Sequence, residues 1–467
     1  PAGPQRLVLW LGTPEFRRGP CRVRINGEPV GPPVSTQPRE YVLLDVRGVT
    51  NSDTLSIHFE SVECGSFSVT GLVFYDPPEA RVRPALWPIF PAHPAMPPPP
   101  SAPTPPHDAV AGSQAAVRDY FLAAYDNYGS FSQAGAWYQN MFPIRALVGN
   151  PTAMEDPRVR AAIVQVVERF VEAQHEDGTW SSDYFGVPGC PLSNEIARGD
   201  ESANLADVGS MALCLTLAQR LSTPEQADRF RAAAQRYAER FVMPAQLADG
   251  AFPNLRWQGT HYTVPYTIAT ATQGLQLFAW GSTSHDDRIR KSGWDALAWL
   301  AASVQPSGAL LFRHHDRTEA VLMTAREMGD LFYVMDSLLE ALAWATPEES
   351  ALLLDSAGRL VEGPSGLLAV MNEPTWWDQA EPWEQAKRIG AASILMRYRL
   401  ARGMDGDLTP MEARLLAACA SPEHGAWYGA FIPQSRIGGE HGATATGLAG
   451  MALNLYASSP SRTVEAP

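Results

Sequence analysis

From about residue 113 to residue 456, apolar residues recur at intervals of three and four, which is the spacing of amphipathic helices. The pattern predicts a series of helices at 113–126, 134–148, 157–174, 202–221, 224–243, 265–280, 284–304, 324–345, 348–361, 382–402, 409–420 and 441–456. Three Thr-Pro pairs predict helix starts, because Thr caps a helix N-terminus and Pro suits the first helical position. They are Thr223-Pro224, Thr346-Pro347 and Thr409-Pro410.

A turn centred on glycine follows five of these helices, and each turn leads into an aromatic or apolar extended stretch. The five glycines are Gly178, Gly250, Gly308, Gly366 and Gly425. Successive glycines are 72, 58, 58 and 59 residues apart, an interval with room for two helices and two loops. Glycine takes the left-handed conformation that commonly ends a helix. The sequence therefore predicts a repeat of helical hairpins.

Small residues are dense in every second predicted helix, which suits an inner ring of closely approaching helices inside an outer one. The links after the glycine turns are long, whereas the links on the other side are short. An open α-solenoid of hairpins is the alternative. The long links, rich in Trp, Arg, His and Glu, favour a closed (α/α)6 toroid over residues 113–457.

The first 76 residues show a different pattern, in which apolar and polar residues alternate as they do in half-buried strands. Strands are expected at 7–11, 21–25, 41–46, 53–60 and 67–75, with a hairpin turn at Asn26-Gly27. We expect a small β-sandwich over 1–76, which resembles the jelly-roll accessory modules of carbohydrate-active enzymes. A proline-rich linker is expected at 77–112 and a disordered tail at 458–467.

Charge and composition exclude some classes of protein. The net charge of −14 argues against a nucleic-acid partner, because phosphate neutralisation needs basic surface. No apolar run is long enough for a transmembrane helix, so no membrane partner is expected. Secreted, periplasmic and cytoplasmic locations stay open, as do removal of a signal peptide and the oligomeric state. The five cysteines form no C-x-x-C pair, and pairing of Cys21 with Cys64 is left open. Neither a metal nor a cofactor is demanded.

The string Gln174-His175-Glu176-Asp177-Gly178-Thr179-Trp180 carries the clearest resemblance. Its Q-x-x-D-G-x-W pattern resembles turns of six-hairpin glycosidases, toroid polysaccharide lyases and terpenoid cyclases. Its physical role is structural, since the glycine reverses the chain and the tryptophan packs back. In these families the active site lies at the open end of the toroid, at the N-termini of the inner helices. That resemblance directs the search to the loops leading into the inner helices.

Tryptophan is concentrated on these loops, where surface segments rarely carry it. Aromatic faces stack on sugar rings, and Arg, Asp and Glu bind hydroxyl and carboxylate groups. An oligosaccharide or polysaccharide is therefore the expected partner. The predicted substrate-binding residues are Trp180, Asp183, Trp257, Arg313, His314, Arg326, Trp376, Trp377, Trp427, Arg436 and His441. For any single charged residue a helix-capping role is the competing interpretation.

A glycoside hydrolase is the favoured activity, and it needs an acidic and a basic carboxylate across the scissile bond. Glu201, Glu327, Glu384 and Glu440 are the candidates, because each lies near the start of a different inner helix. Lyase or uronate C5-epimerase chemistry is the alternative. It would use His261 and Tyr262 for proton transfer, with arginines holding the uronate carboxylate. The segment from Gly366 to Trp377 also resembles, over a short stretch, glucuronyl C5-epimerases.

Three further interpretations are weaker. A terpenoid cyclase would carry an Asp-rich D-x-D-D motif, which is missing from the sequence. A lanthipeptide cyclase-like toroid would need a zinc-binding set of Cys and His, and no such grouping is present. A non-catalytic binding protein built on the same toroid stays open.

Overall fold

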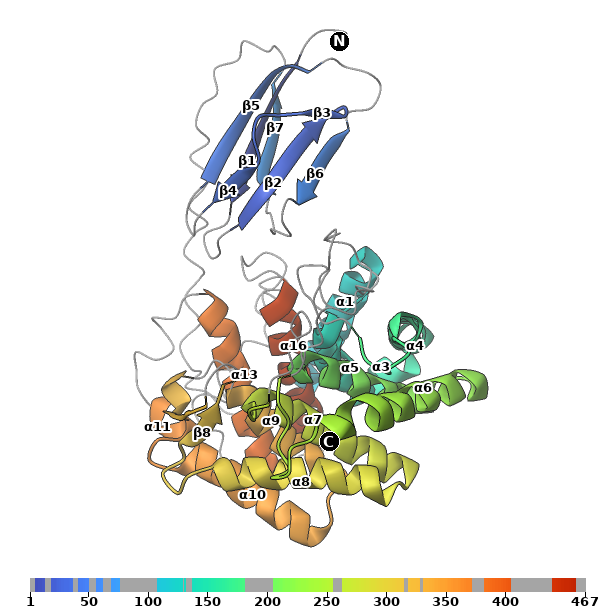
Figure 1. Cartoon of the computed structure of the whole chain (residues 1–467), viewed down its shortest axis with the longest axis vertical. Coiled ribbons are helices and arrows are strands. Elements are labelled where there is room, and N and C mark those ends of the chain that lie inside the picture. Colours follow the sequence, from blue (N-terminus) through green and yellow to red (C-terminus); the bar gives the residue numbers. More distant parts are fainter. Residues whose placement is uncertain are drawn as a thin grey trace. The chain divides into compact units, whose positions relative to one another are not determined.

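The structure is a computed structural model of the whole chain. It describes residues 5–12, 18–36, 41–49, 56–61, 69–75, 107–128, 130–131, 137–180, 205–254, 263–314, 318–327, 331–371, 382–404 and 439–458. These residues fall into two compact units, one containing strands β1 to β7 and the other containing the helices. The two units are shown in Figure 1 and are described separately.

The first unit is built from two antiparallel sheets. In one, β1 (Gln5–Gly12) lies between β5 (Tyr41–Val49) and β7 (Val69–Tyr75). In the other, β2 (Arg18–Ile25) pairs with β3 (Glu28–Pro29), β4 (Val34–Thr36) and β6 (Ile57–Ser61). Alternate residues of β1 and β2, from Leu7 to Leu11 and at Val23 and Ile25, share one hydrophobic core. The jelly-roll character of this unit stays a prediction.

The predicted hairpin turn at Asn26-Gly27 is confirmed. Asn26 has a φ of 51° and Gly27 a φ of 88°, so both central residues are left-handed, as a tight two-residue hairpin requires. The turn places Ile25 opposite Glu28 and Arg24 opposite Pro29 in the pair of strands. A local pattern of two residues thus sets the register of β2 and β3.

The helical unit is built from α-helices together with short 3-10 and π-helical segments. Those of the first half are α1 (His107–Tyr128), η1 (Trp137–Asn140), α2 (Met141–Val148), α3 (Pro151–Glu155), α4 (Pro157–Ala173), α5 (Leu205–Ala218), η2 (Gln219–Leu221), α6 (Pro224–Arg236), η3 (Tyr237–Val242) and η4 (Met243–Ala245). Those of the second half are α7 (Thr267–Ser284), α8 (Asp287–Ser303), η5 (Ala325–Glu327), α9 (Leu331–Ala341), α10 (Pro347–Glu362), α11 (Leu367–Met371), α13 (Pro382–Ala401) and α16 (Gly439–Ala457).

Within the described residues, six of these helices form a closed ring. In order around it, α2, α5, α7, α9, α13 and α16 each contact the next, and α16 contacts α2 again. Helices α4, α6, α8 and α10 contact the ring from outside (Figure 1). An open solenoid would leave α16 and α2 apart, so an open solenoid is inconsistent with the contact between these two helices. The predicted helix 409–420 lies outside the described residues, and the complete set of six hairpins stays a prediction.

Glycine allows the close approach of neighbouring ring helices. A Cβ atom added to Gly447 of α16 would come within 2.5 Å of the backbone of Phe142 in α2. One added to Gly209 of α5 would come within 2.7 Å of the side chain of Gln273 in α7. The expectation that small residues mark the inner helices is confirmed at these contacts.

Three of the predicted glycine turns share one geometry. Gly178, Gly250 and Gly308 have φ values of 96°, 92° and 84°. In each, the glycine amide donates to a carbonyl three residues earlier, which is that of His175, Leu247 or Gln305. Each glycine also touches the backbone of the next outer helix, at Arg236, Asp295 or Arg359 respectively. The turn therefore joins one hairpin to the next.

Gly366 departs from this pattern. Its φ is not in the positive range, and α11 begins directly after it instead of an extended stretch. The backbone is crowded here, because an added Cβ would lie 2.8 Å from the carbonyl oxygen of Leu360. The expectation of a left-handed turn at Gly366 is therefore wrong, and Gly425 lies outside the described residues.

Other boundaries also differ from the expectations. Helix α1 begins at His107, so the end of the predicted linker 77–112 is helical. The predicted helix 324–345 is divided between the 3-10 turn η5 and α9. Before η5, strands β8 (Leu310–Arg313) and β9 (Ala320–Met323) form a hairpin, of which only the first strand was expected as an extended stretch. The predicted tail after residue 458 lies outside the described residues.

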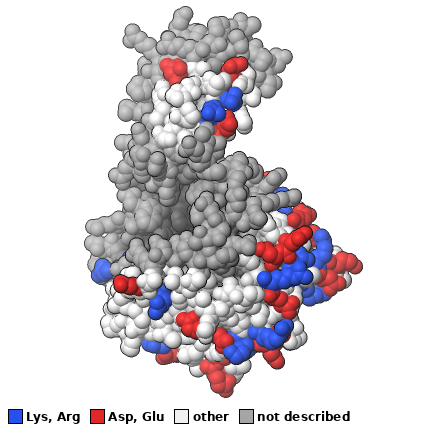
Figure 2. Space-filling model, in the orientation of Figure 1, with Lys and Arg blue, Asp and Glu red and all other residues white. Residues whose placement is uncertain are grey.

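The outer surface of the helical unit carries charges of both signs, close together (Figure 2). Many of them are paired across neighbouring helices, as Arg229 with Glu168 and Arg288 with Glu239. Such exposed pairs each contribute little to stability. The described part of this face shows no broad basic patch, which agrees with the net charge.

Candidate active site at the mouth of the helical ring

Most of the predicted site residues lie beyond the part that the structure describes. Glu201, His261, Tyr262, Asp183, Trp257, Trp376, Trp377, Trp427 and Arg436 lie outside the described residues. Glu327 lies in η5, Glu384 in α13, and Glu440 and His441 in α16, and for these four only the backbone is described. Glu384, Glu440 and His441 thus lie within the first turn of ring helices, and Glu327 precedes α9. Their roles stay predictions.

Trp180 lies in the core of the helical unit. Its side chain is 0% exposed, and its ring lies 5.1 Å from that of Tyr237, centroid to centroid. The indole Nε1 donates a hydrogen bond to the carbonyl oxygen of Phe170 at 2.6 Å. This is the structural role predicted for the tryptophan of the turn. No face of Trp180 is available for a sugar, so it does not belong to a substrate site.

Two of the predicted loops meet at the N-terminus of α7. His314, which follows strand β8, has its ring 5.8 Å from that of Tyr266, the residue that precedes α7. Both rings also contact Phe312. The amide of Arg313 donates to the hydroxyl of Thr267, the first residue of α7, at 2.8 Å. The structure thus places Arg313 and His314 beside the start of ring helix α7, and their role in binding stays a prediction.

Arg326 lies in η5 and is exposed. Its backbone amide donates to the hydroxyl of Thr324 at 3.3 Å. The neighbouring Ala325 donates its amide to the carbonyl oxygen of Ser365, which joins η5 to the turn before α11. Arg326 is thereby held at the surface, close in sequence to the start of α9.

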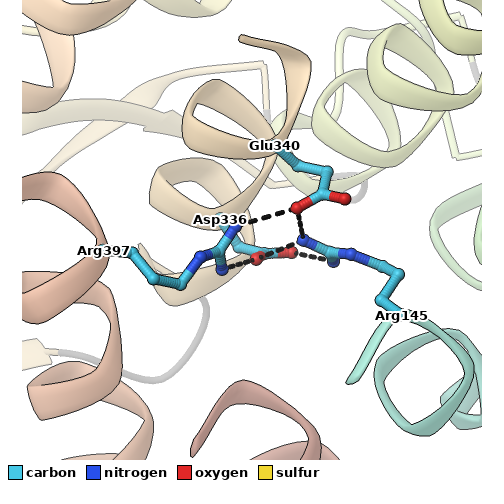
Figure 3. Close-up of polar contacts among 4 residues, drawn as sticks. All are labelled: Arg145, Asp336, Glu340 and Arg397. Carbon is cyan, nitrogen blue, oxygen red and sulfur yellow. Dashed lines mark hydrogen bonds and ion pairs between the residues drawn. The ribbon is translucent and has the colours of Figure 1, made fainter. Parts of the chain in front are cut away.

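The interior of the ring holds a cluster of four charged residues, which we call the charged floor: Arg145, Asp336, Glu340 and Arg397 (Figure 3). Arg145 of α2 donates two hydrogen bonds to the carboxylate of Asp336 in α9, at 2.6 and 2.9 Å. Arg397 of α13 donates to Asp336 and, at 3.0 Å, to Glu340. Arg145 also donates to Glu340. Two arginines and two acids therefore balance in charge.

Burial and the arginines act in opposite directions on Asp336. Burial alone would raise the pKa of its carboxyl group, but the guanidinium groups of Arg145 and Arg397 hold that pKa below its ordinary value. The pKa of Arg145 is raised, because its two acidic partners outweigh the effect of burial. Asp336 and Arg145 are therefore both charged at neutral pH.

The charged floor lies toward the end of the ring at which its helices terminate. Arg145, Glu340 and Arg397 lie in the C-terminal halves of α2, α9 and α13. Phe142 lies one turn nearer the helix N-termini and is fully buried, and its ring contacts that of Tyr333 at 5.8 Å. Phe142 and the charged floor thus form two successive layers inside the ring. We call the end formed by the N-termini of the ring helices the mouth.

Sequence reasoning missed the polar residues that lie inside the ring. Asp207 lies in the first turn of α5 and is 5% exposed, and Asp336 is almost completely buried in α9. Carboxylates are rarely buried without a specific role. The sequence signal was a single Asp within an otherwise apolar, small-residue helix.

No group of three or more His, Cys, Asp and Glu side chains within them could hold a metal ion. No helix in the same part of the chain is both long and apolar enough to cross a membrane.

Comparison with known proteins identifies no family. No family model matches the chain, and no curated protein matches it. Among solved structures, a glycoside hydrolase of family 105 from C. acetobutylicum is similar, with 10% identity, a TM-score of 0.46 and coverage of 74% of this chain and 98% of that chain. A type II terpene cyclase from Scytonema has 13% identity and a TM-score of 0.43, over 76% of this chain and 98% of that chain.

A rhamnosidase from Klebsiella oxytoca, solved with rhamnose bound, is similar over 96% of this chain and 85% of that chain. Its identity is 11% and its TM-score 0.41. With TM-scores below 0.5, these matches assign neither a family nor an activity to the chain.

Proposed function

We propose that the protein is a carbohydrate-active enzyme, and specifically a glycoside hydrolase that acts on an oligosaccharide or polysaccharide at the mouth of the ring. The observation that carries the proposal is the closed ring formed by α2, α5, α7, α9, α13 and α16. The segments expected at its mouth carry Trp257, Trp376, Trp377 and Trp427 in the sequence, together with many of the predicted acidic and basic groups. Aromatic faces together with such groups suit a sugar.

The meeting of Tyr266, Arg313 and His314 at the start of α7 supports this location. An aromatic face beside a cationic side chain suits a sugar, which presents apolar C–H faces and polar hydroxyl groups. Two segments that are far apart in the sequence contribute to this group. The proposed acid and base are drawn from Glu201, Glu327, Glu384 and Glu440, each near the start of a ring helix.

The four glutamates are tested by single substitutions to Gln, which keep the size of the side chain and remove its charge. Loss of a general acid or base lowers turnover by ~10²–10⁴. Glu348→Gln is the matched control, because Glu348 lies exposed in the first turn of the outer helix α10. If all four variants keep the wild-type rate on a substrate that the wild type cleaves, the assignment of these carboxylates is wrong.

Uronate lyase or C5-epimerase chemistry is the second candidate, favoured by the contact of His314 with Tyr266, which follows His261 and Tyr262 closely in the sequence. Product analysis separates the three reactions. Hydrolysis raises the number of reducing ends, a lyase produces an unsaturated uronate that absorbs ultraviolet light, and an epimerase exchanges solvent deuterium into C5. Loss of activity in His261→Ala or Tyr262→Phe, with the four Glu→Gln variants active, would favour this second candidate.

A further inference from the structure

Ring helix α7 carries three buried polar side chains close to its N-terminus. Thr267, Thr270 and Gln273 are each 0% exposed. They are spaced by three residues, and three residues turn a helix by about 300°, so each side chain leaves α7 in a direction about 60° from the one before. Buried polar groups are usually hydrogen-bonded. The three side chains can therefore bond three different neighbours.

Thr267, the first residue of α7, holds the segment that follows α8. Its hydroxyl accepts a hydrogen bond from the amide of Arg313 at 2.8 Å. Arg313 is the last residue of β8, and His314 directly after it contacts the ring of Tyr266. One hydroxyl of α7 thus holds the backbone that carries two of the predicted binding residues.

Thr270, three residues further along, holds the segment that leads into α7 itself. The amide of Phe252 donates to the Thr270 hydroxyl at 3.0 Å. The carbonyl oxygen of Phe252 accepts a hydrogen bond from the amide of Tyr266 at 2.8 Å. Phe252 and Tyr266 are therefore held together at the first turn of α7. In the sequence, His261 and Tyr262 lie between them.

Gln273 holds the start of the neighbouring ring helix α5. Its Nε2 donates to the carbonyl oxygen of Leu205, the first residue of α5, at 2.6 Å. The same nitrogen donates to the hydroxyl of Tyr237 at 2.7 Å. The ring of Tyr237 packs on that of Trp180, the last described residue before α5. Gln273 thus connects the described residues on both sides of the segment that carries Glu201.

We propose that Thr267, Thr270 and Gln273 are positioning residues, which hold three segments at the mouth in fixed positions relative to one another. The proposal rests on the proposed activity and deepens it, because it assigns the support of the candidate site to one ring helix. Since each side chain bonds a different segment, removing one should release one segment only. A general loss of stability would loosen all three together.

Hydrogen exchange followed by mass spectrometry on the full chain tests the three contacts separately. Thr267→Val and Thr270→Val keep the branched shape of the side chain and remove its hydroxyl. Gln273→Met keeps the length of the side chain and removes its donors. We expect exchange to become ~5- to 20-fold faster in the peptide containing Arg313, in that containing Phe252 or at the start of α5, respectively. In each variant the other two places should exchange as in the wild type.

Turnover of a glycan that the wild type cleaves tests the consequence for the site. Each of the three variants should lower turnover ~10- to 100-fold, because a displacement of about 1 Å can cost that much. Thr270→Ser, which restores the hydroxyl, should recover both turnover and exchange. Thr283→Val is the matched control, since Thr283 lies in the last turn of α7 and its hydroxyl donates to Ala279 of the same helix.

Unfolding curves of each variant show whether it is folded. In folded variants, equal acceleration of exchange at all three places, or acceleration at none of them, would overturn the positioning role. Selective acceleration with wild-type turnover in all three variants would also overturn it, because the segments would then be held without consequence for the reaction. Selective acceleration in a protein that cleaves no glycan would instead overturn the proposed function and leave the role of α7 in place.

Discussion

At the scale of single residues, Asp336 is the residue whose loss of charge should change the stability of the fold most. Both guanidinium groups of the charged floor donate to it, and it is inaccessible to water. Asp336→Asn keeps the shape of the side chain but leaves two buried cations with only Glu340 between them. Removing one partner from a buried ion pair costs ~3–5 kcal/mol, and we expect a loss of this size in the free energy of unfolding, measured by urea denaturation at neutral pH.

The dependence on pH tests the same assignment. The pKa of Asp336 is lowered in the folded chain, so its contribution is fully present above the pKa of an unfolded Asp, about 3.9, and is lost as pH falls further. The difference in stability between wild type and Asp336→Asn should therefore shrink below about pH 4. Asp228→Asn, at an exposed position of the outer helix α6, should change stability little at either pH. A difference that stays constant down to pH 2 would contradict a charged Asp336.

At the scale of elements, the glycine turns after the helices are the recurring feature, and Gly308 shows why glycine is needed there. It has a φ of 84°, and an added Cβ would lie 2.4 Å from the carbonyl oxygen of Arg359. Gly308→Ala should cost ~1–2 kcal/mol for the left-handed backbone. The contact with α10 should add a further ~1–3 kcal/mol.

Gly403 separates the two contributions. Its φ is 66°, but nothing lies within 4 Å of the position of an added Cβ. Gly403→Ala should therefore show only the cost of the left-handed backbone. Thermal unfolding of the two variants measures the difference. Equal losses in both would mean that the packing of the turn on α10 contributes nothing.

At the scale of the helical unit, closure of the ring depends on the contact between α16 and α2. Gly447→Ala would place a Cβ within 2.5 Å of the backbone of Phe142 and force the two helices apart. We expect a destabilisation of ~1–3 kcal/mol. Hydrogen exchange should locate the effect of Gly447→Ala. In this variant the exchange rates of the amides in α2 and α16 should rise above the wild-type rates by more than those of the amides in α7 and α8.

Gly112→Ala is the matched control for ring closure. Gly112 lies in α1 with open space around it, so the substitution should stabilise the helix by up to about 1 kcal/mol. Opposite signs for the two Gly→Ala variants would support the role of Gly447 at the contact. If Gly447→Ala also stabilised the chain, close approach of α16 and α2 would not be needed for the fold.

Local patterns determined most of the helix and strand assignments. The helix starts at Thr223 and Thr346 are present as the Thr-Pro pairs predict, and each also forms a capping box, with Gln226 or Glu349 as the reciprocal partner. Their hydrogen bonds involve residues three apart, so the information lies within a short segment. The same holds for Asn26-Gly27 and for three of the glycine turns. The prediction of a left-handed turn at Gly366 was wrong, because the conformation of Gly366 depends on α11 and on crowding by α10.

The candidate site was predicted in part. Its location at the N-termini of the inner helices came from the resemblance and from the concentration of aromatic and charged residues in the loops. Trp180 was placed there as well, although its ring is covered by Tyr237 of a neighbouring hairpin. The residues inside the ring were not found, because a lone Asp in an apolar helix carries no local signal of what it faces.

The sequence by itself determined the helical hairpins, their approximate bounds, the strands of the first unit and the turn role of the Q-x-x-D-G-x-W string, because the interactions behind them join residues close together in the chain. Only the tertiary structure decided that α16 returns to α2 and that four charged residues meet inside the ring. Arg145 and Asp336, two of these four, are 191 residues apart in the chain. Their pairing depends on the order of the helices around the ring, which no local pattern records.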